Sequence, residues 1–298
     1  MATYQEVRLP AVDRGTRPPR RLLRLPLGRL VSRPTGAIGV GIVLLLLVFA
    51  VAAPLLAPFD PIEQPGKRLL DPDSTYLLGT DQFGRDILSR IIYGARVALM
   101  VGVISVSIAL AIGGTLGLIS GFYLGVVDTV VQRVVDTMLA FPSLILIIAI
   151  SSVLGPSMST AMLAIGLVQS SGFARIVRGP VLVVMQEQYV EAARAIGAHP
   201  FTIMYRYLLP NIAAPLIVQT TLAFSGAILA EAGLSFLGLG TQPPDPSWGT
   251  MLGDGRKFME LAPAVAVFPG LAISLAVLGF NLLGDALRDV LDPTLRRR

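Results

Sequence analysis

Cysteine is absent from this chain of 298 residues, and histidine occurs once, as His199. Without cysteine the chain can form no disulfide, thiolate metal site or thiol nucleophile, and a single histidine excludes a histidine-rich metal centre. Charged residues are also scarce, at 14% of the chain, whereas a soluble protein has about 25%. The composition is that of a membrane protein, so the length has to be divided into membrane spans rather than soluble domains.

Lysine is scarce as well. The two lysines, Lys67 and Lys257, both lie outside the G-x4-G-K-[ST] pattern of a phosphate-binding loop. The lysines and His199 also lie outside the predicted spans, so the chain lacks the Ser-Lys and Ser-His pairs of an intramembrane enzyme. We expect no catalytic residue, no metal site and no cofactor bound by this chain. A separate subunit must hydrolyse ATP if ATP drives the protein.

Runs without Asp, Glu, Lys or Arg predict the membrane spans. These runs are 34–59, 97–127, 137–174, 207–230 and 261–284. A single crossing takes about 20 residues of helix, so the run 137–174 is too long for one span. It contains the turn sequence Gly155-Pro156, which predicts a hairpin of two short spans. We therefore expect an all-α polytopic membrane protein with six spans, at about 36–57, 98–121, 138–154, 159–177, 212–234 and 263–285.

Lys and Arg residues in the connecting loops set the orientation of the spans. With six spans, the side that holds both termini carries 17 of them and the other side 7, which places both termini in the cytoplasm. The sequence Ala50-Val51-Ala52 is similar to a signal-peptidase site, but the long basic segment before it favours an uncleaved first span.

The expected parts of the chain are a basic arm (1–35), a first span (36–57), an extracytoplasmic segment with an interfacial helix (58–97), a core of five helices (98–287) and a basic tail (288–298).

A polar stretch at 185–210 lies between two spans on the predicted cytoplasmic side. It contains Glu191-Ala192-Ala193, then Gly197, then Leu209-Pro210. The stretch resembles the EAA loop of permease subunits of binding-protein-dependent ABC importers, whose pattern is E-A-A-x3-G-x9-I-x-L-P. Every fixed position is matched except the isoleucine, which is Tyr207 here. Since Gly197 can end one helix with a positive φ and Pro200 suits the first turn of another, we expect two short helices forming a compact knob.

The resemblance implies a type I ABC importer permease fold and a docking role for this loop. In that family the loop docks in a groove of a cytoplasmic ATPase subunit, which uses ATP and Mg²⁺ to drive transport. The residues implied here are Glu191, Ala192, Ala193 and Gly197, with Ala198 and His199 beside them. The flat surface left by the two alanines would allow close approach. The implied partners are a companion permease subunit, two ATPase subunits, an extracytoplasmic binding protein and the lipid bilayer, with no nucleic acid.

Two outward-facing segments and the tail 291–296 narrow the resemblance to the C-type permease subunit of dipeptide/oligopeptide importers. The first segment, 78–96, contains Arg85 and Asp86. These charges belong either to a surface-lying helix, with its charges in water, or to a grip on the binding protein. The second, 233–249, forms an outer lip (235–262) with Gln242, Pro244 and Trp248. Trp248 is either an interfacial anchor or, with its neighbours, a contact to the docked binding protein.

Small and polar residues inside the spans suggest how the helices pack. Small residues recur every four positions at Ser105, Ala109, Gly113, Gly117, Gly121 and Gly125. They predict close helix packing, with the companion subunit as one candidate partner. Polar residues within the spans either bond neighbouring helices or line the translocation path. They are Gln169, Ser170, Ser171, Gln219, Thr220, Thr221 and Ser225.

The predicted spans carry no ionisable group at their midplane, which argues against a proton-coupled carrier. We also see no inverted repeat of the kind that secondary transporters use. The resemblance therefore favours peptide import. Close relatives in this branch carry nickel complexes, glutathione or other small solutes, which remain alternative substrates, and a secondary transporter is the remote alternative.

Overall fold

The computed structural model describes residues 30–291, and the regular structure of this part is helical apart from one isolated bridge, Thr80–Asp86. Most of the predicted basic arm and tail lies outside the described residues. The helices are α2 (Pro34–Leu56), α3 (Ile87–Ala109), α4 (Thr115–Tyr123), α5 (Gly125–Ala140), α6 (Ser143–Leu154), α7 (Met158–Val184), α8 (Gln188–Ala195), α9 (Pro200–Ile203), α10 (Ala213–Phe236), α11 (Trp248–Gly255) and α12 (Ala264–Leu291). A π-helical turn, Leu110–Gly114, joins α3 to α4.

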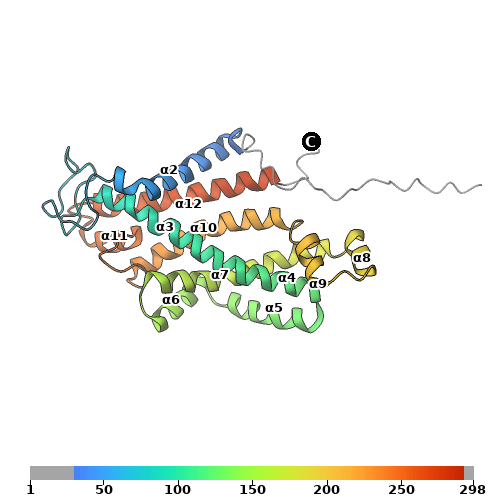
Figure 1. Cartoon of the computed structure of the whole chain (residues 1–298). Coiled ribbons are helices and arrows are strands. Elements are labelled where there is room, and N and C mark those ends of the chain that lie inside the picture. Colours follow the sequence, from blue (N-terminus) through green and yellow to red (C-terminus); the bar gives the residue numbers. More distant parts are fainter. Residues whose placement is uncertain (1–29, 292–298) are drawn as a thin grey trace, which may run out of the picture.

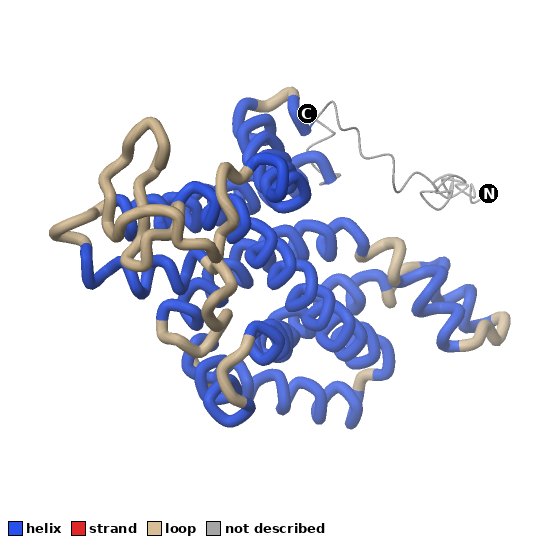
Figure 2. The backbone as a smooth tube through the Cα atoms, turned by 60° about the vertical axis from the view of Figure 1, so that its left-hand side comes forward, coloured by secondary structure: helices blue, strands red, loops and turns tan. Residues whose placement is uncertain are grey.

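The long helices lie roughly side by side in an elongated bundle (Figure 1). The small helices α8 and α9 project at one end, which we call the knob end. The loop 58–86 and α11 lie together at the other end, which we call the cap end, and Figure 2 shows most of the long loops gathered there. Polar segments therefore lie at the two ends of the bundle, with the apolar helices between them.

The predicted spans are confirmed at five places, with changed boundaries. Within the described residues, five helical segments are long and apolar enough to cross a membrane: Pro34–Leu56, Ile87–Tyr123, Met158–Val184, Ala213–Phe236 and Ala264–Leu291. The second of these begins eleven residues before the predicted 98, because Asp86 caps α3 and its helix runs straight on. This helix replaces the separate interfacial helix predicted within 58–97.

The predicted third span, 138–154, is wrong as a single helix. The chain bends by 92° between α5 and α6, at Phe141-Pro142, because proline has no N–H to continue the ladder and biases the residue before it toward an extended conformation. Residues 122–137, predicted as a loop, instead form much of α5. The turn predicted at Gly155-Pro156 is confirmed, since Gly155 has a φ of +90° between α6 and α7. The count of spans reaches six if the bent pair α5 and α6, which we call the broken span, is taken as one crossing.

The ridge of small residues packs within this chain, against α7. A Cβ added to Gly113 would lie 2.1 Å from the carbonyl oxygen of Ser170, and one added to Gly117 would lie 2.4 Å from that of Ala174. The hydroxyl of Ser105 donates to the carbonyl of Met162 at 3.0 Å. The suggestion that this ridge packs against a companion subunit is therefore wrong: close approach of α3 and α4 to α7 uses its glycines.

Helix α2 packs on α3 and α12 through apolar residues, and an arginine of α3 compensates for a proline within it. Pro54 lies inside α2 and has no N–H to give to the carbonyl of Ala50, four residues earlier. Arg96 of α3 supplies the missing donor: its Nε donates to Ala50 O and its Nη2 to Val51 O. An unsatisfied carbonyl is costly in a membrane, so this contact explains why an arginine lies beside an apolar helix.

We expect Arg96→Met to destabilise the chain by about 1–3 kcal/mol, the usual cost of leaving a buried carbonyl unpaired. Pro54→Ala returns an N–H to position 54, so the Pro54→Ala/Arg96→Met double variant is expected to recover most of that loss. Thermal unfolding of the four proteins in lipid nanodiscs measures the coupling. If Arg96→Met lowered the stability equally in the presence and absence of Pro54→Ala, Arg96 would stabilise the chain by some means other than replacing the missing donor of Pro54.

Candidate functional site

The knob, residues 185–210, has the two-helix geometry that the sequence predicts. Helix α8 ends in a Schellman motif, in which the N–H of Gly197 donates to Arg194 O and that of Ala198 to Ala193 O, both at 3.0 Å. Gly197 has a φ of +74°, a conformation that glycine adopts without steric cost. Helix α9 begins at Pro200, and Nδ1 of His199 accepts from the N–H of Phe201 at 3.3 Å. The turn is therefore fixed by backbone bonds at the end of α8 and by a side-chain cap at the beginning of α9.

An apolar cluster fixes the knob to the bundle. Val190, Ala193, Ile203 and Leu208 of the knob are buried, and they pack with four residues at the ends of three helices: Phe122 of α4, Val177 and Val181 of α7, and Ile212 just before α10. The guanidinium of Arg194 also lies over the Phe122 ring, 5.5 Å from its centroid. A movement of the knob therefore acts directly on α4, α7 and α10.

The six knob residues implied by the motif do not all face solvent. Glu191, Ala192, Gly197 and His199 are exposed and Ala198 is half-buried, but Ala193 is buried in the apolar cluster. The expectation that both alanines leave a flat outer surface is thus wrong for Ala193, which packs inward. Burial and, to a lesser extent, the Glu187 carboxylate raise the pKa of the Tyr189 hydroxyl, so this hydroxyl stays protonated at physiological pH.

Exposed apolar side chains cover the outer surface of the knob, and the sequence argument missed them. Ile196 is 84% exposed, and Phe201 and Tyr205 are each 66% exposed. The rings of Phe201 and Tyr205 are parallel, within 1°, with centroids 6.2 Å apart. An exposed apolar patch on a polar segment marks an interaction surface. The i, i+4 spacing of the two rings was the available signal, since it places them on one helical face.

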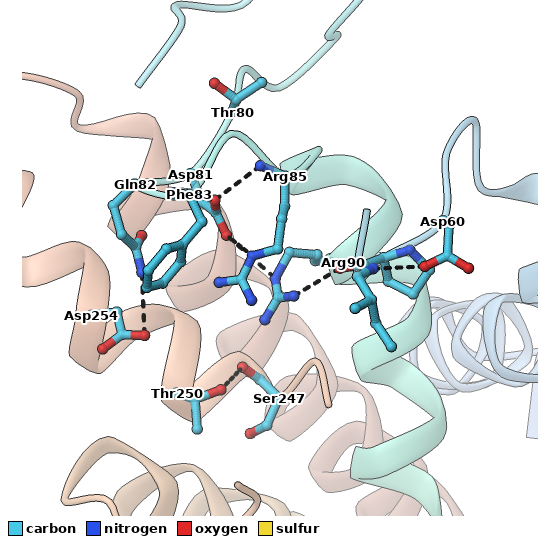
Figure 3. Close-up of polar contacts among 12 residues, drawn as sticks. Asp60, Thr80, Asp81, Gln82, Phe83, Arg85, Arg90, Ser247, Thr250 and Asp254 are labelled. Carbon is cyan, nitrogen blue, oxygen red and sulfur yellow. Dashed lines mark hydrogen bonds and ion pairs between the residues drawn. The ribbon is translucent and has the colours of Figure 1, made fainter. Parts of the chain in front are cut away.

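The cap end is organised by Asp81 (Figure 3). One carboxylate oxygen of Asp81 accepts from the backbone N–H of Phe83 at 2.8 Å and of Arg85 at 3.0 Å. The other accepts from Nε of Arg85 at 2.6 Å and lies 3.7 Å from Nε of Arg90. Arg90 also donates to the carbonyl of Pro61 at 2.8 Å. All three charged side chains are buried, so the loop 58–86 is folded around an ion cluster.

Three residues predicted to meet water or a partner at the cap end are buried. Asp86 is 1% exposed and caps α3 through the N–H and hydroxyl of Ser89, at 2.7 and 2.6 Å. Arg85 is also buried, so the expected surface helix with its charges in water is wrong. Trp248, 3% exposed, donates from Nε1 to the carbonyl of Ile91 at 2.9 Å, and its role as an interfacial anchor is wrong too. Gln242 and Pro244 are exposed, as expected of a lip.

A buried carboxylate fixes the lip through partners that the sequence pattern did not indicate. Oε1 of Glu231, near the cap end of α10, accepts from the hydroxyls of Ser235, Thr241 and Ser247 at 2.6, 3.1 and 2.9 Å. The amide of Gln82 also donates to Asp254 of α11 at 3.2 Å, as Figure 3 shows. The loop 58–86, the lip and the beginning of α3 therefore form one connected cap.

Most of the polar residues within the spans bond their own helix, so the expected helix-to-helix bonding is wrong for them. The hydroxyls of Ser170, Ser171, Thr220 and Thr221 donate to carbonyls three or four residues earlier. Two residues do bond another helix. The hydroxyl oxygen of Ser225 lies 2.8 Å from Oδ1 of Asn281 in α12 and 2.7 Å from the carbonyl of Leu222 in its own helix, and the amide of Gln169 lies 3.5 Å from the carbonyl of Ala223. Within the described part of the chain, Oε1 of Gln169 is buried without a hydrogen-bond partner.

Comparison with known families gives two matches that together cover most of the chain. Residues 113–297 match the binding-protein-dependent transport system inner membrane component, and residues 22–72 match the N-terminal TM domain of oligopeptide transport permease C. The first match includes the knob and the lip, and the second includes α2.

Similar proteins include the dipeptide transport system permease protein DppC of Alkalihalophilus pseudofirmus, which is 47% identical over 90% of this chain and 88% of that protein. The di/tripeptide transport system permease protein DppC of Pseudomonas aeruginosa is 48% identical over 88% and 89%. The glutathione transport system permease protein GsiD of Escherichia coli O6:K15:H31 is 44% identical over 85% and 84%.

Among solved structures, inward-facing conformations of the MetNI methionine ABC transporter contain a chain that aligns with a TM-score of 0.56. That alignment has 18% identity and covers 69% of this chain and 98% of the other. At this identity the likeness concerns the fold alone, and it confirms the fold that the EAA resemblance implies.

Proposed function

Because the chain belongs to the family of binding-protein-dependent transport system inner membrane components, we propose that it is one of two permease subunits of an ABC importer for dipeptides or short oligopeptides. Transport, rather than catalysis, is the activity of this family. The observation that carries the proposal is the knob, which presents exposed apolar side chains beside the EAA motif and whose core is continuous with three long helices. The peptide substrate is supported by the names of relatives that are 46–48% identical.

Energy enters through the knob in this proposal. Two cytoplasmic ATPase subunits bind the knobs of the two permease subunits, and ATP-driven closure of the ATPases displaces the knobs. Since Phe122, Val181 and Ile212 share the knob's apolar cluster, α4, α7 and α10 move with it and the path opens toward the cap end. The knob end is then cytoplasmic and the cap end faces the binding protein, as the 17 to 7 distribution of Lys and Arg favours.

The proposed docking contacts at the knob are Ile196, Phe201 and Tyr205, beside Glu191, Ala192 and Gly197. Aromatic side chains that fill pockets dominate interface energies, whereas Ala193 supports the knob from inside. At the cap end, Gln242 and Pro244 are proposed to contact the binding protein. Arg85, Asp86 and Trp248 act indirectly by shaping the cap, because all three are buried.

Gln169 and Ser225 are the strongest candidates for the translocation path. The free acceptor of Gln169 lies between α7 and α10, and the Ser225–Asn281 bond lies between α10 and α12. A peptide substrate carries backbone N–H donors that such acceptors satisfy. Gln219 is proposed to line the same path. The hydroxyls of Ser170, Ser171 and Thr220 already donate to carbonyls of their own helices. On the path these side chains would leave space for the substrate because they are small, rather than form hydrogen bonds with it.

Reconstitution in liposomes tests the proposal. The chain is combined with its companion permease, the ATPases and the binding protein, and uptake of a labelled dipeptide is compared with uptake of glutathione. We expect ATP-dependent uptake of the dipeptide and no ATPase activity from this chain alone. Preferential uptake of glutathione would favour the alternative substrate, which the 44% identical relatives represent. ATP hydrolysis by the isolated chain would contradict the subunit role.

The orientation is tested separately with single cysteines, which the cysteine-free chain permits. We expect Pro244→Cys to react with a membrane-impermeant maleimide from outside intact cells, and His199→Cys to react only after permeabilisation. Both positions are exposed, so burial does not limit the reaction. The reverse pattern would place the knob outside the cell and contradict the proposed mechanism.

A further inference from the structure

Helix α5 has little apolar packing of its own. Within α5, which the structure describes in full, Val135 is the one buried residue. Many of its valines are exposed, among them Val126 and Val130. Two ion pairs join α5 to α7 instead, Asp128–Arg178 and Asp136–Arg175. The position of α5 therefore depends on charged contacts to the helix that leads into the knob.

Of the two ion pairs, Asp128–Arg178 has the more complete set of hydrogen bonds. Nε of Arg178 donates to Oδ1 of Asp128 at 2.7 Å and its Nη2 donates to Oδ2 at 2.5 Å. The fully buried Ser120 of α4 donates to Oδ1 at 2.5 Å, and the amide of Gln132 donates to Ser120 at 3.0 Å. We call these four residues the clamp. A two-pronged arginine–carboxylate contact fixes orientation as well as distance, so the clamp sets the angle between α5 and α7.

The arginine of the clamp lies on the stem of the knob, the last turns of α7, two residues before Pro180. Val177 and Val181, on either side of Arg178 in sequence, belong to the apolar cluster that also contains the knob's Val190 and Ile203. A Cβ added to Gly121 of α4 would lie 2.7 Å from Val181, so α4 packs closely against this part of α7. Because the cluster holds Val177 before Pro180 and Val181 after it, a displacement of the knob is transmitted across the proline to the turn that carries Arg178.

The helix at the other side of the clamp belongs to the broken span. Asp128 is in the first turn of α5, whereas the 92° bend to α6 follows its last residue, Ala140. A bend at a proline is a place where two helical arms can change their angle. In contrast, Asp136 and Arg175 are each about half exposed, and exposed ion pairs fix geometry weakly. The clamp is thus the stronger of the two ion-pair contacts that join the knob's stem to the broken span.

From this arrangement we propose that the clamp is a positioning element for transport, which transmits displacement of the knob into α5 and so into the broken span 125–154. The proposal rests on the proposed function, because the displacement comes from the ATPases. In this proposal Asp128 and Arg178 contact neither ATP nor the substrate. Their role is to make the broken span follow the knob, so that hydrolysis and opening of the path remain coupled.

The complete reconstituted transporter tests the clamp through Asp128→Asn, which keeps the shape of the side chain and removes its charge. We expect peptide uptake per ATP hydrolysed to fall about tenfold, the factor for losing one charge-assisted hydrogen bond, while ATPase activity changes less than about twofold. Asp136→Asn is the matched control, since it breaks the exposed pair on the same helix, and it is expected to alter uptake per ATP less than about twofold.

A distance measurement separates coupling from simple destabilisation. Single cysteines at Val130 of α5 and Val183 of α7, both exposed, are spin-labelled in the otherwise cysteine-free chain. We expect one narrow distance distribution in the nucleotide-free and ATP-bound transporter, and a broad distribution in Asp128→Asn. Arg178→Lys keeps the charge but loses the two-pronged geometry, so it serves as the second variant if Asp128→Asn inserts poorly.

Two results would contradict the proposed role of the clamp: unchanged peptide uptake per ATP hydrolysed in Asp128→Asn, or an unchanged narrow distance distribution in that variant. Failure of the proposed function would look different. In that case the wild-type complex would itself not couple hydrolysis to uptake, while the label distances would still report whether Asp128 fixes α5 to α7.

Discussion

Ile196→Asp is expected to abolish ATP-driven uptake while leaving the fold and membrane insertion of the chain intact. Ile196 is 84% exposed, so its side chain contributes little to the stability of this subunit. In the proposed complex it enters an apolar groove of the ATPase, where an unpaired carboxylate is strongly disfavoured. Loss of such a contact weakens binding by about 2–4 kcal/mol, which is about 30- to 1000-fold in affinity. Uptake by reconstituted complexes and co-purification of the ATPases measure the effect.

The matched control for that substitution is Gln188→Asp. It adds the same charge to α8 at an exposed position in the first turn, where the helix dipole favours an acidic side chain. We expect normal ATPase binding in this variant. Phe201→Ala should reduce binding to an intermediate degree, because the stacked Tyr205 ring remains. Full ATPase binding by Ile196→Asp would show that the apolar patch lies outside the interface between the knob and the ATPase. Glu191 and Ala192 would then be the main docking residues.

The comparison between Ala193 and Ile196 shows what the sequence could predict. The motif located the knob, its glycine turn and its two helices, because each follows from local backbone chemistry at Gly197 and Pro200. It could not tell which side chains point outward, since that depends on how the knob packs against Phe122, Val181 and Ile212 from other helices. Ala193 is buried by those tertiary contacts, and the apolar residues that remain exposed became visible only once the packed face was known.

The errors at the cap end and in the third span have different origins. The sequence showed Arg85, Asp86 and Arg90 close together beside an apolar run, and charges in such a place usually face water. Their burial depends on Asp81 and on the carbonyl of Pro61, which the loop 58–86 brings back onto α3. In the third span, hydropathy alone could not distinguish a helix that crosses once from a pair bent at Pro142. Long-range contacts decide the first case, whereas the second follows from the local chemistry of Phe141-Pro142, which a hydropathy argument does not read.

Asp81→Asn is expected to unfold the cap. Asp81 is the carboxylate that lies within 4 Å of both Arg85 and Arg90, and all three side chains are buried. Removing its charge leaves two buried guanidinium groups close together without compensation. Breaking a buried ion pair by removing one partner costs about 3–5 kcal/mol, a large share of the stability of a domain. Thermal unfolding of the purified chain in nanodiscs measures the loss.

Limited proteolysis locates the damage and decides whether the ion cluster is its cause. Lys67 and Arg68 are exposed in the loop 58–86, so trypsin should cleave Asp81→Asn there much faster than the wild type. Asp60→Asn is the matched control in the same loop: Asp60 is exposed, and its Oδ1 accepts from the N–H of Ile62 at 2.8 Å, a contact drawn in Figure 3. Loss of this hydrogen bond should cost less than about 1 kcal/mol.

Equal protection of both variants from trypsin would mean that backbone hydrogen bonds alone hold the cap. Such bonds run from the N–H of Gly66 to the carbonyl of Gly84 and from the N–H of Thr80 to the carbonyl of Leu70. Selective cleavage of Asp81→Asn, together with loss of binding-protein-stimulated ATP hydrolysis, would instead show that the buried charges shape the surface on which the binding protein docks.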